Sequence, residues 1–264
     1  MRIVILTGNA IRHKFIANTL AKNADDSLVV SECTDSISEK GDKFKTHTTK
    51  IEEHFLLRQQ TEKVFFNKND FFISKTLPIL YKEVNLPNIY GIIKDFSPEA
   101  IFSFGPSIIK YHLLTILPPG HFINLHLGLS PYYRGSGTNF WPFVNEELEF
   151  VGATIMHINA GIDTGDIIVH VTPQIEVGDN VHTVGCKVIS ESAMRLIEIM
   201  GMLRNGKVLK RVKQWEIPDV RYYKDSDFNE DALNRYKKNL DSGLIEKFIK
   251  NPKKPIVLVT NENL

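Results

Sequence analysis

The segment IVILTGN, at residues 3–9, runs four apolar residues directly into a glycine turn. A short apolar run of this kind is typical of a buried strand, and residues 11–21 after it have the spacing of an amphipathic helix. A strand, a tight turn and a helix open a βαβ unit, in which the next strand pairs in parallel. We therefore expect an α/β protein.

Further strand and helix patterns alternate along the chain. Strands are expected at residues 28–30, 100–104, 122–126, 151–158 and 167–171, and helices at 89–96, 107–114 and 180–203. This alternation predicts an open, mostly parallel twisted sheet with helices on both faces, a Rossmann-like architecture. Ligands bind such sheets beyond the carboxyl ends of the strands, where the strand order reverses.

The expected core ends at about residue 206, because Asn205-Gly206 is a typical helix end. Residues 1–206 are predicted to form one catalytic domain, with a helical insertion of one or two helices at about residues 39–85. The lysines of this insertion are typical of a solvated helix face. Residues 207–264, with a strand-like stretch at 208–212 and a polar tail, are expected to form a small C-terminal appendage.

Composition and charge exclude several classes of protein. The 264 residues are 42% apolar and 24% charged, which excludes a collagen-like or wholly disordered chain. The 32 Lys and Arg residues balance the 31 Asp and Glu residues, so no general attraction to nucleic acid or to a membrane is expected. Two cysteines exclude a disulfide scaffold, and the start of the chain lacks a secretory pattern. A cytoplasmic protein is expected.

The first turn, TGNAIRH at residues 7–13, contains a single glycine. It therefore lacks both the GxGxxG dinucleotide fingerprint and the GxxxxGK[ST] phosphate loop. The helix that starts after Gly8 could hold an anion, together with Arg12 or Lys14, but a plain turn is an equally good interpretation. The histidines show no metal-ligand spacing, so no metal site is predicted.

Two polar segments stand out from this background. Asn124 and His126 are two residues apart in a strand pattern and therefore point to the same face, at the carboxyl end of that strand. Each buried polar side chain must find a hydrogen bond, so such a pair is seldom without a purpose. Asp163 lies in a turn, GIDTGD at residues 161–166, that joins two further strands. An acid between glycines is by itself usually turn chemistry.

Taken together, Asn124-Leu125-His126, the loop that ends in PYYRG at residues 131–135 and the turn around Asp163 resemble the formyltransferase family that uses 10-formyltetrahydrofolate. The resemblance covers roughly residues 100–206. It implies the Rossmann-like formyltransferase fold, 10-formyltetrahydrofolate as the formyl donor and Asn124, His126 and Asp163 as the catalytic trio. It also implies that the folate ring contacts two backbone segments, formed by Phe104, Gly105, Pro106, Ser107 and Ile108 and by Ala160, Gly161 and Ile162. One segment, LGLSP at residues 127–131, departs from the family's common pattern.

The residue types suit formyl transfer to a primary amine. Attack on the formyl carbon places negative charge on the formyl oxygen, and an oriented amide such as that of Asn124 can stabilise this charge. His126 can serve as a general acid or as a second donor to that oxygen. Asp163 would orient the imidazole and favour its protonated form.

An amino-sugar nucleotide is the expected acceptor, a small molecule held by the possible contacts Arg12, Lys14, Tyr132, Tyr133 and Arg134. Glycinamide ribonucleotide is an alternative, but the first turn lacks the Gly/Ser-rich sequence that usually holds its phosphate. Methionyl-tRNA is a second alternative. The near-neutral charge disfavours it, and the roughly 58 residues after Gly206 are too few for the further C-terminal domain that such enzymes carry. A formyltetrahydrofolate hydrolase and a silent binding module also remain open. No nucleic-acid or membrane partner is expected, and a homodimer is possible.

Overall fold

The computed structural model describes residues 1–33, 49–218, 220–251 and 255–260. Within them, seven strands form the main sheet: β1 (Arg2–Gly8), β2 (Asp26–Cys33), β3 (Lys75–Leu80), β4 (Ala100–Phe104), β5 (Phe122–His126), β7 (Ala153–His157) and β8 (Ile167–Val171). The helices are α1 (Ile11–Lys22), α3 (Thr49–Phe65), α4 (Pro87–Phe96), α5 (Tyr111–Leu114), α6 (Trp141–Val144), α7 (Val181–Arg204), α8 (Glu230–Asp241) and α9 (Leu244–Lys250). Three 3₁₀ turns, at Glu83–Asn85, Leu148–Phe150 and Asp225–Asp227, and a small pair of strands, β6 (Tyr133–Gly135) and β9 (Arg221–Tyr223), complete the described elements.

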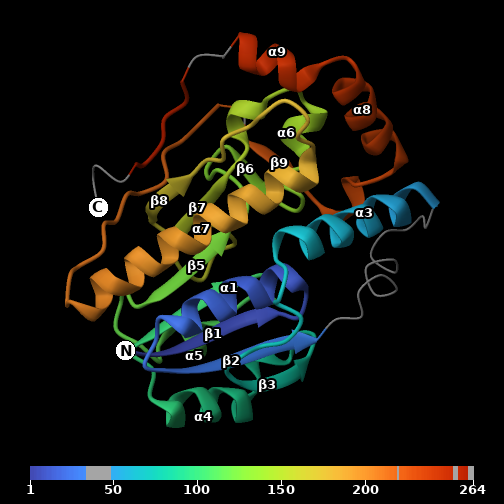
Figure 1. Ribbon diagram of the computed structural model, residues 1–264. Coiled ribbons are helices and arrows are strands. Elements are labelled where there is room, and N and C mark those ends of the chain that lie inside the picture. Colours follow the sequence, from blue (N-terminus) through green and yellow to red (C-terminus); the bar gives the residue numbers. More distant parts are fainter. Residues whose placement is uncertain (34–48, 219, 252–254, 261–264) are drawn as a thin grey trace.

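The strand order of the main sheet is β3-β2-β1-β4-β5-β7-β8 (Figure 1). All pairings from β3 to β5 are parallel, and β7 and β8 are antiparallel additions. The expectation of an open, mostly parallel sheet is therefore confirmed. Because the chain adds β2 and β3 on one side of β1 and then crosses to β4 on the other, the strand order reverses between β1 and β4.

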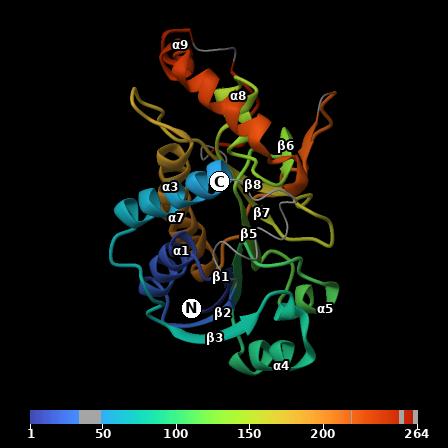
Figure 2. The same ribbon diagram turned by 90° about the vertical axis from the view of Figure 1, so that its right-hand side faces the viewer.

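Alternate residues of β1 belong to two separate cores. Ile3 and Ile5 pack in a large cluster with residues of α1 and α7, whereas Val4 and Leu6 pack in a smaller one with residues of α4. Successive side chains of a strand point to opposite faces, so a strand that is apolar throughout requires cover on both sides. Figure 2 shows α1, α3 and α7 on one side of the sheet and α5 on the other.

The described part of the expected insertion is α-helical only in its first half. It contains one long helix, α3, and then the strand β3, which extends the sheet beside β2. Strand β3 was missed because it pairs on one side only and carries Pro78, which a sheet tolerates at its edge. Residues 39–48 of the predicted insertion lie outside the described residues.

Two other local expectations are corrected. The helix expected from residue 107 begins only at Tyr111, and Ser107 is not its cap. Both the backbone N–H and the hydroxyl of Ser107 donate instead to the Glu32 carboxylate. The strand-like stretch at 208–212 contributes a single bridge, between Ile167 and Val212.

The residues after 206 pack onto the rest of the chain. Strand β9 pairs with β6, and buried residues of α8 and α9, among them Leu233 and Tyr236, belong to the larger core. Tyr132 and His170 fasten the last described segment by hydrogen bonds to the backbone of Val257 and Val259. In the described part of the chain, no helix combines the length and the apolar character needed to cross a membrane.

Candidate active site

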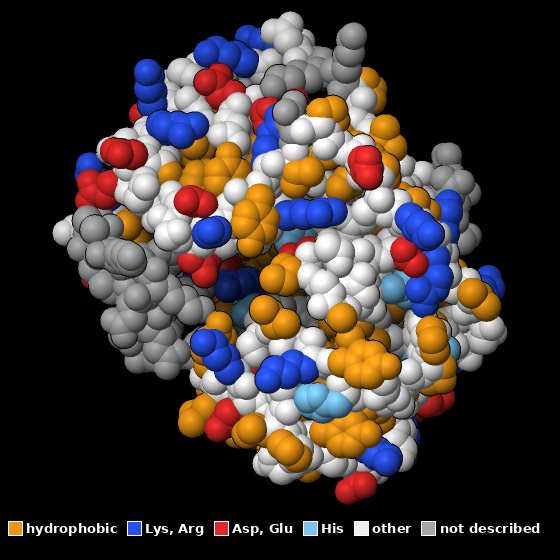
Figure 3. Space-filling view, turned by 180° about the vertical axis from the view of Figure 1, so that it is seen from behind, with side chains coloured by type: hydrophobic (Ala, Val, Ile, Leu, Met, Phe, Trp, Pro, Cys, Tyr) orange, Lys and Arg blue, Asp and Glu red, His pale blue; other side chains and the backbone are white. Residues whose placement is uncertain are grey.

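A cavity of about 950 Å³ lies at the carboxyl ends of β1, β4 and β5, where the strand order reverses. Gly8 lines it from the end of β1, Phe104 from β4, and Asn124 and His126 from β5. The turn around Asp163 contributes a further wall. Figure 3 shows a hollow in this face of the molecule, with basic side chains around it.

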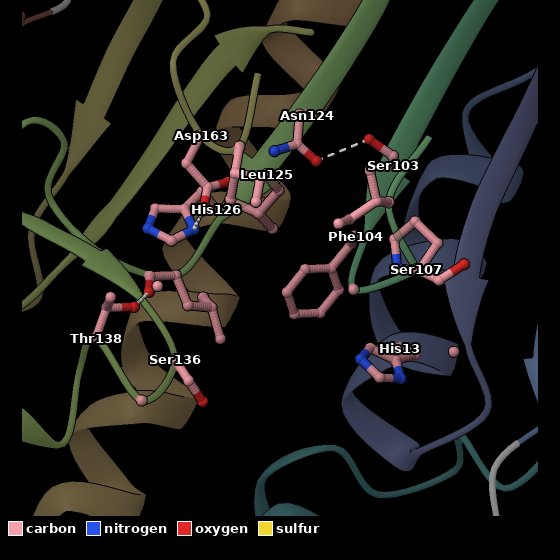
Figure 4. A pocket seen from close by; sticks show the side chains of 18 of the residues that line it. His13, Ser103, Phe104, Ser107, Asn124, Leu125, His126, Ser136, Thr138 and Asp163 are labelled. Carbon is pink, nitrogen blue, oxygen red and sulfur yellow. Dashed lines mark hydrogen bonds and ion pairs between the residues drawn. The ribbon is translucent and has the colours of Figure 1, made fainter. Parts of the chain in front are cut away.

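The amide of Asn124 is oriented by a neighbouring strand. Ser103 on β4 lies opposite Asn124 in the parallel pairing, and its hydroxyl donates to the Asn124 Oδ1 atom at 2.8 Å. With Oδ1 engaged, the amide nitrogen turns towards the side of the cavity where His126 and Asp163 lie (Figure 4). The arrangement presents N–H donors to a ligand in the cavity.

His126 and Asp163 contact each other directly. The Nδ1 atom of His126 lies 3.3 Å from the Asp163 Oδ2 atom, and the two side chains are 9% and 18% exposed. A carboxylate at Nδ1 keeps the proton of the neutral imidazole on that nitrogen. The opposite nitrogen, Nε2, is buried and has no hydrogen-bond partner. Asp163 therefore orients the imidazole, and its second nitrogen is left without a partner in the protein.

The turn that carries Asp163 is held by its glycines and by a distant glutamine. A side chain at Gly165 would overlap the His157 carbonyl, and Asp163 itself has a positive φ of 52°. The Gln214 side-chain amide donates to the carbonyls of Asp163 and Gly165 at 2.8 and 3.0 Å. These contacts fix the backbone from which the carboxylate reaches His126.

Gly128 allows the loop after β5 to pass beside the imidazole. Its φ is 156°, and a Cβ atom there would lie 2.8 Å from the His126 Nε2 atom and 2.7 Å from the Thr138 Cβ atom. The Thr138 hydroxyl donates to the Leu127 carbonyl and closes this loop (Figure 4). The unusual LGLSP segment thus brings backbone close to the predicted reacting centre.

The residues predicted to contact the donor come from two segments, and all but one of them line the cavity. The exception is Ala160, which precedes Gly161 and Ile162 in the same turn. The buried carboxylate of Glu32 holds the other segment, because its oxygens accept from the Ser107 backbone N–H and hydroxyl at 2.7 Å and from the Lys82 N–H at 3.0 Å. The residues that do line the cavity are Phe104, Gly105, Pro106, Ser107, Ile108, Gly161 and Ile162.

The first turn was expected either to hold an anion or to be a plain turn. In the structure, the side chain of His13 lies there. The His13 imidazole packs over the turn, so close that a Cβ atom at Gly8 would lie 2.6 Å from Nδ1 and one at Gly105 2.8 Å from Nε2. The His13 Nδ1 atom also accepts from the Ala10 N–H at 3.3 Å. His13 therefore occupies the space at the start of α1, which favours the plain-turn interpretation.

Of the residues predicted to contact the acceptor, only Arg12 lines the cavity. Lys14 donates to the Asp70 carbonyl instead. Tyr132 and Tyr133 are buried beneath the loop, where their hydroxyl groups bond to Val257 and Glu147. The structure brings none of these three side chains to the cavity, since the two tyrosines face the core and Lys14 is directed to the Asp70 carbonyl.

Arg134 also stays outside the cavity but is connected to it. Its guanidinium donates to the Gln214 Oε1 atom at 2.8 Å, and the amide of the same Gln214 holds the Asp163 turn. The effect of Arg134 on the site is therefore indirect. A glutamine far along the chain has no sequence signal that would have revealed this link.

Other lining residues were also missed from the sequence. Arg58 lies on α3, in the segment whose lysines were interpreted as a solvated face, and it lines the cavity together with Gln59 and Glu62. Ser103 offered a weak signal, as the single polar residue of the strand AIFSF at residues 100–104. Among the described residues, no group of three or more His, Cys, Asp or Glu side chains is placed to hold a metal ion.

Residues 1–200 match the family model described as formyl transferase. The chain belongs to the formyl transferase family. The methionyl-tRNA formyltransferase of Desulforamulus reducens is 34% identical to this formyl transferase over 128 residues, which cover 48% of this chain and 40% of that protein. A second such enzyme, from Dictyoglomus turgidum, is 34% identical over 143 residues and is covered to 45%. The chain thus spans less than half the length of these curated relatives.

Solved structures show the same fold at low sequence identity. The N-formyltransferase of Helicobacter canadensis, in complex with folinic acid and dTDP-3-aminofucose, has a TM-score of 0.54 and 19% identity, over 87% of this chain and 73% of that one. Glycinamide ribonucleotide transformylase 1 of Symbiobacterium toebii has a TM-score of 0.55 and 16% identity, over 82% and 94%. The expected fold and family are therefore confirmed.

Proposed function

We propose that this formyl transferase moves a formyl group from 10-formyltetrahydrofolate to a primary amine of a small molecule, an amino-sugar nucleotide. The observation that carries the proposal is the contact of His126 with Asp163, beside the oriented Asn124 amide, at the mouth of one cavity. The Helicobacter canadensis neighbour, which binds folinic acid and an amino-sugar nucleotide, is consistent with it.

We infer that the donor lies against the segment that follows β4 and the turn that contains Gly161. Phe104, Pro106 and Ile108 supply apolar surface, and the backbone around Gly161 supplies hydrogen-bonding groups. A mostly apolar wall with a few fixed polar groups is typical of a site for a flat heterocyclic ligand. The donor supplies the activated formyl group, and the side chains of Asn124, His126 and Asp163 line the same cavity.

Each side chain of the trio has a defined part in this reaction. When the amine attacks the formyl carbon, the Asn124 amide donates to the formyl oxygen as it becomes negative. His126 accepts the proton that the amine loses and returns it to the folate nitrogen when the carbon–nitrogen bond of the donor breaks. Asp163 accepts from Nδ1 and stabilises the imidazolium between these two transfers.

One observation favours a small acceptor, and another disfavours glycinamide ribonucleotide. Residues 222–225, in β9 and directly after it, line the cavity, so the C-terminal part of the chain encloses the space that the acceptor would enter. His13 fills the first turn, where a glycinamide ribonucleotide transformylase would hold a phosphate. The similarity to methionyl-tRNA formyltransferases keeps a tRNA acceptor as the alternative.

Incubation of the protein with 10-formyltetrahydrofolate tests the reaction class. Amine-dependent formation of tetrahydrofolate is expected with an amino-sugar nucleotide panel, whereas formate release without an amine would indicate a hydrolase. His126→Ala and Asp163→Ala are each expected to lower turnover by at least about 100-fold while donor binding survives. If the protein formylates only glycinamide ribonucleotide or only methionyl-tRNA, that molecule replaces the amino-sugar nucleotide as the acceptor.

Near-normal turnover in either variant would remove that residue from the mechanism. Asp166→Asn is a matched control, since Asp166 lies in the same turn and its carboxylate pairs with Arg211 rather than with His126. This variant is expected to keep most of the activity.

A further inference from the structure

A second, smaller cavity of about 180 Å³ adjoins the first. Three separate segments of the chain form it: α3, the loop that leads into α6, and the residues after β9. Some side chains border both cavities, so the smaller one is a side pocket of the larger. These shared residues are Arg58, Ser136, Gly137, Lys224 and Asp225.

Aromatic rings form the far end of this side pocket. His54, Phe55 and Phe228 meet in pairs with ring centroids 5.2 to 5.4 Å apart. Phe140 contacts Phe228 at 4.9 Å, and Trp141 lies beside it. Interiors that are simply packed leave few voids larger than a water molecule, so a space of this size between rings suits a planar ring that stacks on them.

The junction between the two cavities carries excess positive charge. The guanidinium of Arg12 lies 2.8 Å from the Glu62 Oε1 atom, and the Arg58 Nε atom lies 3.7 Å from the same oxygen. Two cations therefore share one carboxylate, and the buried Nε atom of Arg58 has no hydrogen-bond partner. Burial, together with repulsion from Arg12, lowers the pKa of Arg58 to about 9. An anionic ligand would relieve this imbalance.

Lys224 adds a third cation at this junction, from the segment that follows β9. The neighbouring carboxylate of Asp225 accepts from the Ser136 hydroxyl. Arginine and lysine side chains converging from different segments are the usual partners of phosphate oxygens. A ligand with a ring in the side pocket would therefore place its phosphates at the junction and extend towards His126 in the main cavity.

The volume of the side pocket selects the kind of ring. A cavity of about 150 Å³ holds one benzene molecule, so 180 Å³ matches a single substituted six-membered ring better than the two fused rings of a purine. We propose that the side pocket binds the pyrimidine ring of a nucleotide-linked acceptor, with its phosphates at Arg58, Arg12 and Lys224. This inference rests on the proposed function, since it places the amine end of the acceptor beside the trio.

The family match does not assign this pocket. Lys224, Asp225 and Phe228 lie beyond residues 1–200, which match the family model, and α3 belongs to the segment that the sequence predicted as a helical insertion of unassigned role. The acceptor preference would thus be set by parts of the chain outside the trio and its strands.

Calorimetry without any donor tests the proposal. UDP and dTDP are expected to bind at least tenfold more tightly than ADP and GDP, and inorganic pyrophosphate more weakly than all four. Arg58→Gln is expected to weaken every nucleotide and pyrophosphate about ten- to hundredfold, because a charged hydrogen bond is lost. Phe228→Ala is expected to weaken UDP and dTDP while leaving pyrophosphate binding unchanged.

Matched controls are Arg195→Gln, which removes a guanidinium paired with Glu198 on α7, and Phe71→Ala, which removes an exposed ring. Neither residue lines either of these two cavities, and both variants are expected to bind as the unaltered protein does. Phe228→Leu serves in place of Phe228→Ala if the latter lowers the melting temperature.

Equal binding of purine and pyrimidine nucleotides would overturn the assignment of the ring. Unchanged nucleotide binding in Arg58→Gln and in both Phe228 variants would overturn the location. Because donor is absent, these results are separate from the reaction itself. Formyl transfer without nucleotide binding would reject the side pocket alone, and nucleotide binding without formyl transfer would reject the reaction alone.

Discussion

The Ser103 hydroxyl determines which end of the Asn124 amide faces the cavity. Because it donates to Oδ1, the N–H groups of the amide remain for a ligand. In the same way, Asp163 contacts Nδ1 of His126 and leaves Nε2 without a partner. At the scale of single residues, the site therefore contains two side chains with predicted catalytic roles, Asn124 and His126, and two side chains that orient them.

Replacement of Ser103 by alanine tests this orientation. A neutral hydrogen bond contributes about 0.5–1.5 kcal/mol, so Ser103→Ala is expected to lower kcat by roughly two- to tenfold with little change in the KM for the donor. Ser192→Ala is the control, since Ser192 is also buried and its hydroxyl bonds to the Val188 carbonyl in α7, away from the cavity. Equal activity of the two variants would show that the Asn124 amide keeps its orientation without the Ser103 hydroxyl.

The turn between β7 and β8 determines the position of the Asp163 carboxylate. Asp163 sits there with a positive φ, between glycines whose missing side chains let the turn pass the end of β7. Gln214 and, through it, Arg134 hold the backbone of this turn. The long helix α7 is stabilised in another way. Asn180 caps its first turn, and its buried face lies against the sheet.

Two glycine substitutions distinguish these elements. Gly165→Ala is expected to lower both the melting temperature and turnover, since its Cβ atom would overlap the His157 carbonyl and displace the Asp163 turn. Gly185→Ala, in α7, meets nothing within 4 Å and is expected to raise the free energy of unfolding by about 0.5–1 kcal/mol without changing turnover. Full activity of Gly165→Ala would contradict the role of this turn.

At the scale of the whole molecule, buried histidines connect the C-terminal segments to the core. His170 donates from Nε2 to the Ser130 carbonyl and accepts at Nδ1 from the Val259 N–H. Burial lowers the pKa of His170 to about 4 from an ordinary value of 6.5, and that of His182 likewise to about 4. Both residues are neutral in the folded protein at pH 7.

The stability of the fold is therefore expected to depend on pH. Between pH 6.5 and about 4 the unfolded chain binds protons at these histidines that the folded chain does not, so the free energy of unfolding falls as the pH is lowered through this window. Urea unfolding at several pH values measures the slope, and His170→Asn is expected to make it shallower. An unchanged slope in this variant would show that His170 does not contribute.

Periodicity in the sequence was sufficient for the class of fold. The apolar run of β1, its alternation with helices and the capped helix at 180–203 report local preferences that the sheet then satisfies, and the family resemblance is confirmed. Strand β3 was missed, because an edge strand with one partner and a proline lacks a clear apolar pattern. The catalytic roles of Asn124, His126 and Asp163 stay a prediction, although their proximity is now established.

The sequence by itself established the sheet, the family and the residues that meet around His126, because these depend on short-range patterns and on motifs. The approach of α3 and residues 224–228 to one pocket depended on the packing of segments far apart in the chain. So did the burial of Tyr132 and Tyr133, and the link from Arg134 through Gln214. No local pattern encodes such contacts, since each is fixed by the shape of a partner that the sequence places elsewhere.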